Sequence, residues 1–127
     1  MKSIILDTNI FVRYFLKDVV SQYSEAQKLV SKIEAGEIAG KVSILVIDEL
    51  VWVLENYYKI PRKIFVPQIL KVFALPGIKI MEAEKSIIME IIEDMETRKF
   101  DFTDFYLARI SGSEEIFSFD KDLLKIK

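Results

Sequence analysis

The sequence predicts an α/β protein with a central parallel sheet flanked by helices. Short apolar runs of β-type residues alternate along the 127-residue chain with longer segments whose apolar residues recur at helical spacing. Neighbouring parallel strands need crossover connections, and the helical segments can supply them. No repeat, low-complexity tract or Pro/Gly/Ser linker interrupts the pattern, so we expect residues 1–127 to form a single domain.

The first half of the chain begins with a short strand. Its apolar run stops at Asp7, and the next apolar residues recur at helical spacing up to a stop signal at Gly36. A second β-type run is followed directly by another helical pattern. In order, the expected elements are a strand over 2–6, helices over 10–17 and 22–35, a strand over 41–46 and a helix over 47–59.

Proline and glycine residues mark where helices start, break or stop in the second half of the chain. Pro61 suits the first turn of a helix, whereas Pro67 predicts a kink or split within it. Asp101 and Gly112 bracket the last helical pattern as start and stop signals. The expected elements are helices over 61–75, 83–96 and 102–111, with strands over 78–81 and 115–119.

The composition excludes several kinds of chemistry. The chain has no cysteine and no histidine, which removes disulfides, zinc sites built on thiolate or imidazole, and histidine-based catalysis. Its formal net charge of -2 does not indicate a bulk nucleic-acid binder. No apolar run reaches the roughly 18 residues of a membrane span, and the start MKSIILD meets an aspartate too early for a signal peptide. We therefore expect a soluble, cytoplasmic protein.

Carboxylates are the main remaining candidates for chemistry. Ligands in α/β sheets bind outside the carboxyl ends of the strands, where Asp7 and Asp120 follow two of the predicted strands. Glu49 lies in the first turns of helix 47–59 on a mostly apolar stripe, and Asp104 lies in the first turn of helix 102–111.

Each of these acids also has a purely structural explanation. Asp101 and Asp104 match an N-cap and third-position pattern, and acids at helix starts, Asp120 included, are favoured by about 0.3 to 1 kcal/mol. Glu49 can extend to solvent or pair with a distant lysine. Asp7 is harder to explain, because no basic residue is near it in sequence.

A second pair of acids is expected to face solvent. Asp48 shares a helix face with Trp52 and Glu55. Glu55 can pair there with Lys59 at i+4.

Taken together, the four candidate acids favour a bound cation. Two unit charges about 4 Å apart repel by about 4 kcal/mol at an effective dielectric of about 20. Oxygen ligands suit Mg²⁺ or Mn²⁺, which can lower the pKa of bound water and neutralise a phosphodiester.

Four segments of the chain resemble the acidic signatures of PIN-domain nucleases. The resemblance is closest to the VapC-like toxins of bacterial and archaeal toxin–antitoxin pairs. It implies a PIN-like three-layer fold and an acidic, metal-binding centre of Asp7, Glu49, Asp104 and Asp120. The segments are LDTNIFVRYFLKD (6–18), VIDELVWVLENYY (46–58), FDFTDFYLARI (100–110) and FSFDKDLLKI (117–126).

The resemblance also implies supporting residues, a substrate and partners. Thr8 or Asn9 and Ser118 would orient acids or water, while Asp101 or Asp122 could share the shell and leave the fourth ligand open. The expected activity is Mg²⁺- or Mn²⁺-dependent cleavage of RNA, leaving a 3′-hydroxyl and a 5′-phosphate. A homodimer and a blocking antitoxin are the expected partners.

Two other functions remain open: an RNA-processing or decay nuclease without an antitoxin, and a non-catalytic binding module. Apolar surface supports a partner. Residues 10–16 are apolar nearly all round if helical, and the helix from Ile47 adds Trp52, Tyr57 and Tyr58. Burial beneath the chain's own helices is the alternative explanation for this surface.

Overall fold

A three-stranded parallel sheet organises the fold in the computed structural model, which describes residues 2–126. The strands are β1 (Lys2–Ile5), β2 (Ile38–Val42) and β3 (Ile78–Ile80), in the order β1-β2-β3. Lys2 is in register with Ile38, and Gly40 with Ile78. The α/β class with a parallel sheet is confirmed, and β1 lies at an edge.

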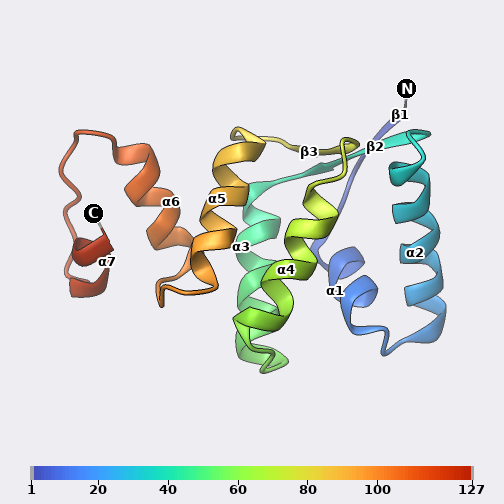
Figure 1. The fold of residues 1–127 in the computed structure, drawn as a ribbon, viewed down its shortest axis with the longest axis horizontal. Helices are drawn as coiled ribbons and strands as arrows, with labels where there is room; N and C mark the ends of the chain where they lie inside the picture. Colours follow the sequence, from blue (N-terminus) through green and yellow to red (C-terminus); the bar gives the residue numbers. More distant parts are fainter. Residues whose placement is uncertain (1, 127) are drawn as a thin grey trace.

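Helices account for most of the remaining described chain. In the view of Figure 1, α1 to α5 lie on one side of the strands, and α6 and α7 lie at the end of the molecule away from β1. No helix within residues 2–126 is long and apolar enough to cross a membrane. The helices are α1 (Thr8–Leu16), α2 (Val20–Glu34), α3 (Ile44–Trp52), the π-helical turn η1 (Val53–Tyr57), α4 (Arg62–Phe73), α5 (Lys85–Met95), α6 (Phe102–Ser111) and α7 (Lys121–Ile126).

The core fills the space between these helices and one face of the sheet. A Cβ atom at Gly40 would lie 2.8 Å from Leu6 Cδ1 and 2.9 Å from Ile33 Cδ1, so glycine lets α2 approach β2 closely. The opposite face of the sheet is different, because it carries a row of exposed side chains. That row consists of Ile5, Lys41 and Lys79.

The second strand differs from the prediction for 41–46. It begins at Ile38 and ends at Val42. Ser43 then caps α3, since its Oγ accepts a hydrogen bond from the Leu45 N–H at 3.2 Å. The apolar residues 44–46 therefore begin a helix. A short apolar run has no periodicity that separates a strand from a buried helix start.

The predicted split at Pro67 is wrong, because α4 runs without a break from Arg62 to Phe73. The missing N–H would have bonded the Lys63 carbonyl one turn earlier. Both residues are exposed, so solvent can satisfy that carbonyl.

The predicted strand over 115–119 is also wrong. The segment has no strand assignment and pairs with none of the described strands. A strand needs a neighbour for its backbone hydrogen bonds, and none lies beside this segment. The chain instead continues into the short helix α7, which was not expected.

Arg62 ties together the turn η1, α4 and the link from α5 to α6. Its Nε donates to Glu55 Oε2 at 2.6 Å and its Nη2 to Glu55 Oε1 at 3.0 Å. Glu55 therefore pairs with Arg62 and not with Lys59 as expected. The remaining nitrogen, Nη1, donates to the carbonyls of Met95 (3.2 Å), Arg98 (3.1 Å) and Phe100 (2.8 Å).

Candidate active site

Asp7 lies where β1 ends and α1 begins. It occupies the N-cap position with extended backbone, yet its exposed side chain makes no capping hydrogen bond. The Asp7 carboxylate therefore does not cap α1. Thr8 next to it is 5% exposed, and its Oγ1 has no hydrogen-bond partner in the described part of the chain. Asn9 is exposed.

A second polar group, formed by Ser43 and Glu82, follows the carboxyl ends of β2 and β3. Glu82 Oε2 accepts from Ser43 Oγ at 2.6 Å, and Oε1 accepts from the Ile44 N–H at 2.8 Å. These hydrogen bonds lower the pKa of Glu82. Glu82 is not among the candidates predicted from sequence, although it follows the apolar run 78–81 much as Asp7 follows 2–6. Its observed role is to hold the start of α3.

The two neighbouring acids of α3 differ in burial. Glu49 is exposed, whereas Asp48 is half-buried and its Oδ1 accepts a hydrogen bond from Thr103 Oγ1 at 3.1 Å. This bond connects α3 to the first turn of α6. The expectation that Asp48 faces solvent is therefore corrected, because α6 covers part of that helix face.

Asp104 lies among other acids at the start of α6. Partial burial raises its pKa, and the negative charges of Asp101, Asp120 and Asp122 raise it further. The backbone of Asp101 opposes the shift through a hydrogen bond to the carboxylate. The structure thus brings Asp101, Asp120 and Asp122 within electrostatic range of Asp104.

Asp120 and Ser118 also have local structural roles. Asp120 Oδ1 accepts from the Asp122 N–H at 2.9 Å at the start of α7. Ser118 Oγ accepts from the Asp120 N–H, also at 2.9 Å. Ser118 therefore orients the backbone that carries Asp120.

The candidate residues fall into two separate parts of the molecule. Asp7 and Thr8 lie at the sheet, and Asp104 and Asp120 lie in the C-terminal part with α6 and α7 (Figure 1). Carboxylate and hydroxyl oxygens are the ligands that Mg²⁺ and Mn²⁺ prefer. Residues 2–126 nevertheless contain no group of three or more acids placed to hold a metal ion. The residue types suit such an ion.

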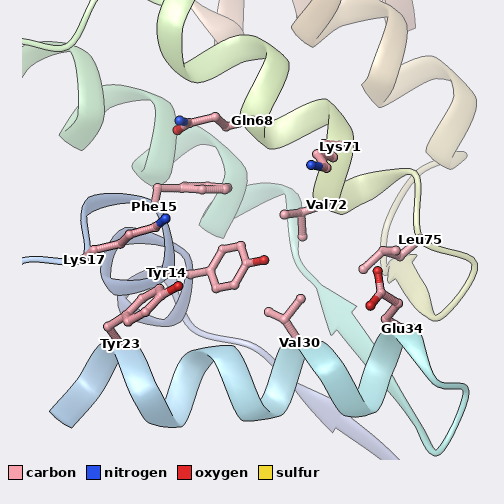
Figure 2. Close-up of a pocket in the computed structure, with 10 residues that line it drawn as sticks. All are labelled: Tyr14, Phe15, Lys17, Tyr23, Val30, Glu34, Gln68, Lys71, Val72 and Leu75. Atoms are coloured by element: carbon pink, nitrogen blue, oxygen red, sulfur yellow. The ribbon is translucent and has the colours of Figure 1, made fainter. Parts of the chain in front are cut away.

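A groove of about 260 Å³ lies apart from these acids, between α1, α2 and α4. Figure 2 shows Tyr14, Phe15 and Tyr23 on one side and Lys71 from α4 across from them. Burial raises the pKa of Tyr14. Lys17 lies over the Tyr23 ring, 5.5 Å from its centre. The groove thus combines aromatic walls with lysines at its margin.

The apolar surface expected over residues 10–16 is partly covered by the chain itself. Phe11 and Val12 are buried, whereas Tyr14 and Phe15 are only half-buried and line the groove. The helix after β2 leaves more surface open, since Trp52 is 60% exposed.

Comparison with known proteins gives one match. A family model described as PIN domain matches residues 4–127 of the chain. Neither the curated proteins nor the solved structures contain a significant match.

Proposed function

Because the chain belongs to the PIN domain family, whose fold is generally that of a nuclease, we propose that it is a metal-dependent endoribonuclease acting as the toxin of a toxin–antitoxin pair. The observation that carries the proposal is the environment of Asp104. Its carboxylate is half-buried, and the charges beside it are those of other acids. A protein keeps such repulsion where a cation is bound.

The proposed site residues are Asp7, Glu49, Asp104 and Asp120, which would hold Mg²⁺ or Mn²⁺. When bound, the ion would supply an activated water and neutralise the charge of a phosphodiester. The Thr8 hydroxyl next to Asp7 is a buried polar group with no partner in the described residues, and it is available to orient a ligand there. Ser118 positions Asp120 through its backbone N–H.

Metal dependence and the role of Asp104 are tested together with purified protein and RNA. Excess chelator should abolish cleavage, and added Mg²⁺ or Mn²⁺ should restore it. Asp104→Asn should lower cleavage by about 100-fold or more, because it removes a carboxylate that would hold the metal ion. Glu25→Gln, at an exposed acid of α2, is the matched control and should leave cleavage unchanged. Full activity in chelator would overturn the mechanism, and RNA binding without cleavage would indicate a binding module.

The antitoxin part of the proposal uses the groove between α1, α2 and α4. Its aromatic walls suit the apolar face of a peptide helix, and Lys17 and Lys71 suit acidic residues along the helix edge. A basic side chain at the end of such a segment would reach toward the acids. Co-expression with a short neighbouring reading frame should give a stable complex with suppressed cleavage, and Lys71→Glu should weaken that complex. Failure to co-purify would favour a processing nuclease that has no antitoxin.

A further inference from the structure

We propose that single-stranded RNA binds along a track of two adjoining hollows that leads to the start of α6. The phosphates of the strand lie in a basic groove between the start of α4 and the link from α5 to α6. One of its bases stacks on Trp52 in a second hollow, between α3 and the start of α6. Binding itself is independent of cleavage, whereas the choice of RNA as the strand rests on the proposed nuclease function.

The basic groove has a volume of about 480 Å³ and lies where α4 begins beside the α5–α6 link (Figure 1). Glu55 neutralises Arg62 in its lining, because two nitrogens of Arg62 donate to the Glu55 carboxylate. Three further cations of the lining stand against one further acid, Glu96. A chain with a formal net charge of -2 thus concentrates positive charge at one place, which attracts a polyanion. The three cations are Lys63, Arg98 and Lys99.

Arg98 is already held in place at this groove. Its guanidinium lies 5.4 Å from the ring centre of Phe100 and 5.5 Å from that of Phe105. The Arg98 carbonyl accepts a hydrogen bond from Arg62 Nη1 at 3.1 Å, which fixes the backbone of the link. A guanidinium restricted in this way loses little conformational freedom on binding, and its planar fork matches phosphate oxygens. The exposed Arg98 is therefore suited to hold a phosphate.

The second hollow, of about 160 Å³, adjoins the basic groove. Glu55 and Met95 line both spaces, which therefore meet at these two residues. Trp52 also lines the second hollow and is 60% exposed, which is unusual for a ring with so much apolar area. Asn56 Nδ2 donates to the Trp52 carbonyl at 3.2 Å. An exposed aromatic ring beside a basic groove is the arrangement that binds the bases and backbone of a single strand.

The charges of the two hollows determine which part of the strand lies in each. Asp48 and Asp101 line the hollow beside Trp52, and their carboxylates repel a phosphate. A base is uncharged, and its amino group can donate a hydrogen bond to a carboxylate. The base therefore lies at Trp52 and the phosphates lie in the basic groove. Asp101 directly precedes α6, whose first turn carries Asp104, so the track leads to one of the proposed metal-binding acids.

Tryptophan fluorescence tests the stacking without relying on cleavage. Trp52 is the only tryptophan of the chain, so quenching by a bound base reports on this site alone. Titration of the Asp104→Asn protein with a short oligoadenylate RNA should give saturable quenching. An RNA duplex of the same length should give none, because its bases are already stacked on one another. Absence of quenching by the single strand, or equal quenching by the duplex, would overturn the track.

Two variants of Trp52 separate stacking from a general effect on the fold. Binding of labelled oligoadenylate is measured by fluorescence anisotropy. Trp52→Ala should lower the affinity about 10-fold, whereas Trp52→Phe keeps an aromatic face and should retain most of it. Equal losses in the two variants would contradict a stacking role for Trp52.

Salt dependence tests the basic groove. Each phosphate contact of a single strand contributes about -0.7 to the slope of log affinity against log salt concentration. Lys63→Gln/Lys99→Gln should therefore flatten the slope by about 1.4 and weaken binding at low salt. The control Lys28→Gln/Lys32→Gln removes the same charge from exposed positions of α2 and should change neither quantity. Equal effects of the two double variants would overturn the groove as the phosphate site.

The remaining outcomes separate the track from the proposed function. Equally tight binding of an oligodeoxyadenylate would overturn the choice of RNA. RNA binding that depends on Trp52, Lys63 and Lys99, without cleavage by the wild-type protein, would reject the proposed function and leave the track standing. Cleavage that Trp52→Ala and Lys63→Gln/Lys99→Gln both leave unchanged would overturn the track and leave the function standing.

Discussion

Residues 2–100 and the segment 112–126 contain similar apolar side chains but bury them very differently. Phe65 and Phe73 are 0% exposed in the core, whereas Phe117 and Phe119 are 87% and 94% exposed. Within the described residues of the segment, only Leu123 is a buried hydrophobic residue. Burial therefore depends on whether a complementary surface lies within reach, and not on the apolar character of a side chain alone.

Two ion pairs show a similar contrast between a half-buried and an exposed environment. Arg62 and Glu55 have side-chain exposures of 14% and 31%, and Arg62 also bonds three carbonyls. Arg109 of α6 pairs with Glu90 of α5 at 2.9 Å, with side-chain exposures of 43% and 61%. The Arg62–Glu55 pair is partly buried and holds several elements together, whereas the Arg109–Glu90 pair is exposed to solvent. The same charges should therefore differ in their contribution to stability.

The largest expected effect comes from exchanging one phenylalanine in each region for alanine. Phe73→Ala should lower the free energy of unfolding by about 3 to 5 kcal/mol, because the buried ring packs edge-on against Phe11 at 5.8 Å. Phe119→Ala should change it by less than about 0.5 kcal/mol at dilutions where the chain is monomeric. Urea unfolding measures both. Equal losses in the two variants would show that Phe119 is buried within a single chain.

A smaller effect is expected from the two arginines. Arg62→Met should destabilise the protein by about 2 to 4 kcal/mol, because it leaves Glu55 and three carbonyls without their donor. Arg109→Met removes a pair of the same type in water and should cost less than about 1 kcal/mol. Thermal denaturation of the two variants gives the comparison. Similar melting temperatures would contradict the role of Arg62 in joining η1, α4 and the α5–α6 link.

The smallest effect concerns Asp104 and depends on pH. Its folded pKa is raised above the ordinary value, so the folded state binds the proton more tightly than the unfolded state. Stability from this group is therefore greatest at low pH and is lost as pH rises through the folded pKa. Asp104→Asn should raise the melting temperature by roughly 1 to 3 °C at pH 7 without metal. The gain should vanish below about pH 3, where the carboxyl is protonated in both states.

The control for this series is Glu25→Gln, whose side chain is exposed on α2. It should leave the melting temperature unchanged across the same pH range. A lower melting temperature for Asp104→Asn at pH 7 would instead indicate that Asp104 mainly stabilises the start of α6.

Local patterns predicted most of the fold. The order of strands and helices up to α6 follows from apolar periodicity and from stop signals such as Gly112. The acids at the start of α6 could be found in the same way, because their spacing is a property of one short segment. The PIN family match over residues 4–127 agrees with the acidic signatures in the sequence.

Tertiary contacts decided the remaining features. Whether 44–46 extends β2 or begins α3 depends on Ser43, which is held by Glu82 in the segment after β3. From the sequence, Glu55 could pair with Lys59 four residues away. It bonds Arg62 instead, because α4 folds back beside η1. A strand-like sequence over 115–119 becomes a strand only where another edge accepts its hydrogen bonds. Sequence by itself determined what each segment prefers, and the tertiary structure decided which partners were within reach, because burial and pairing are properties of two surfaces and not of one.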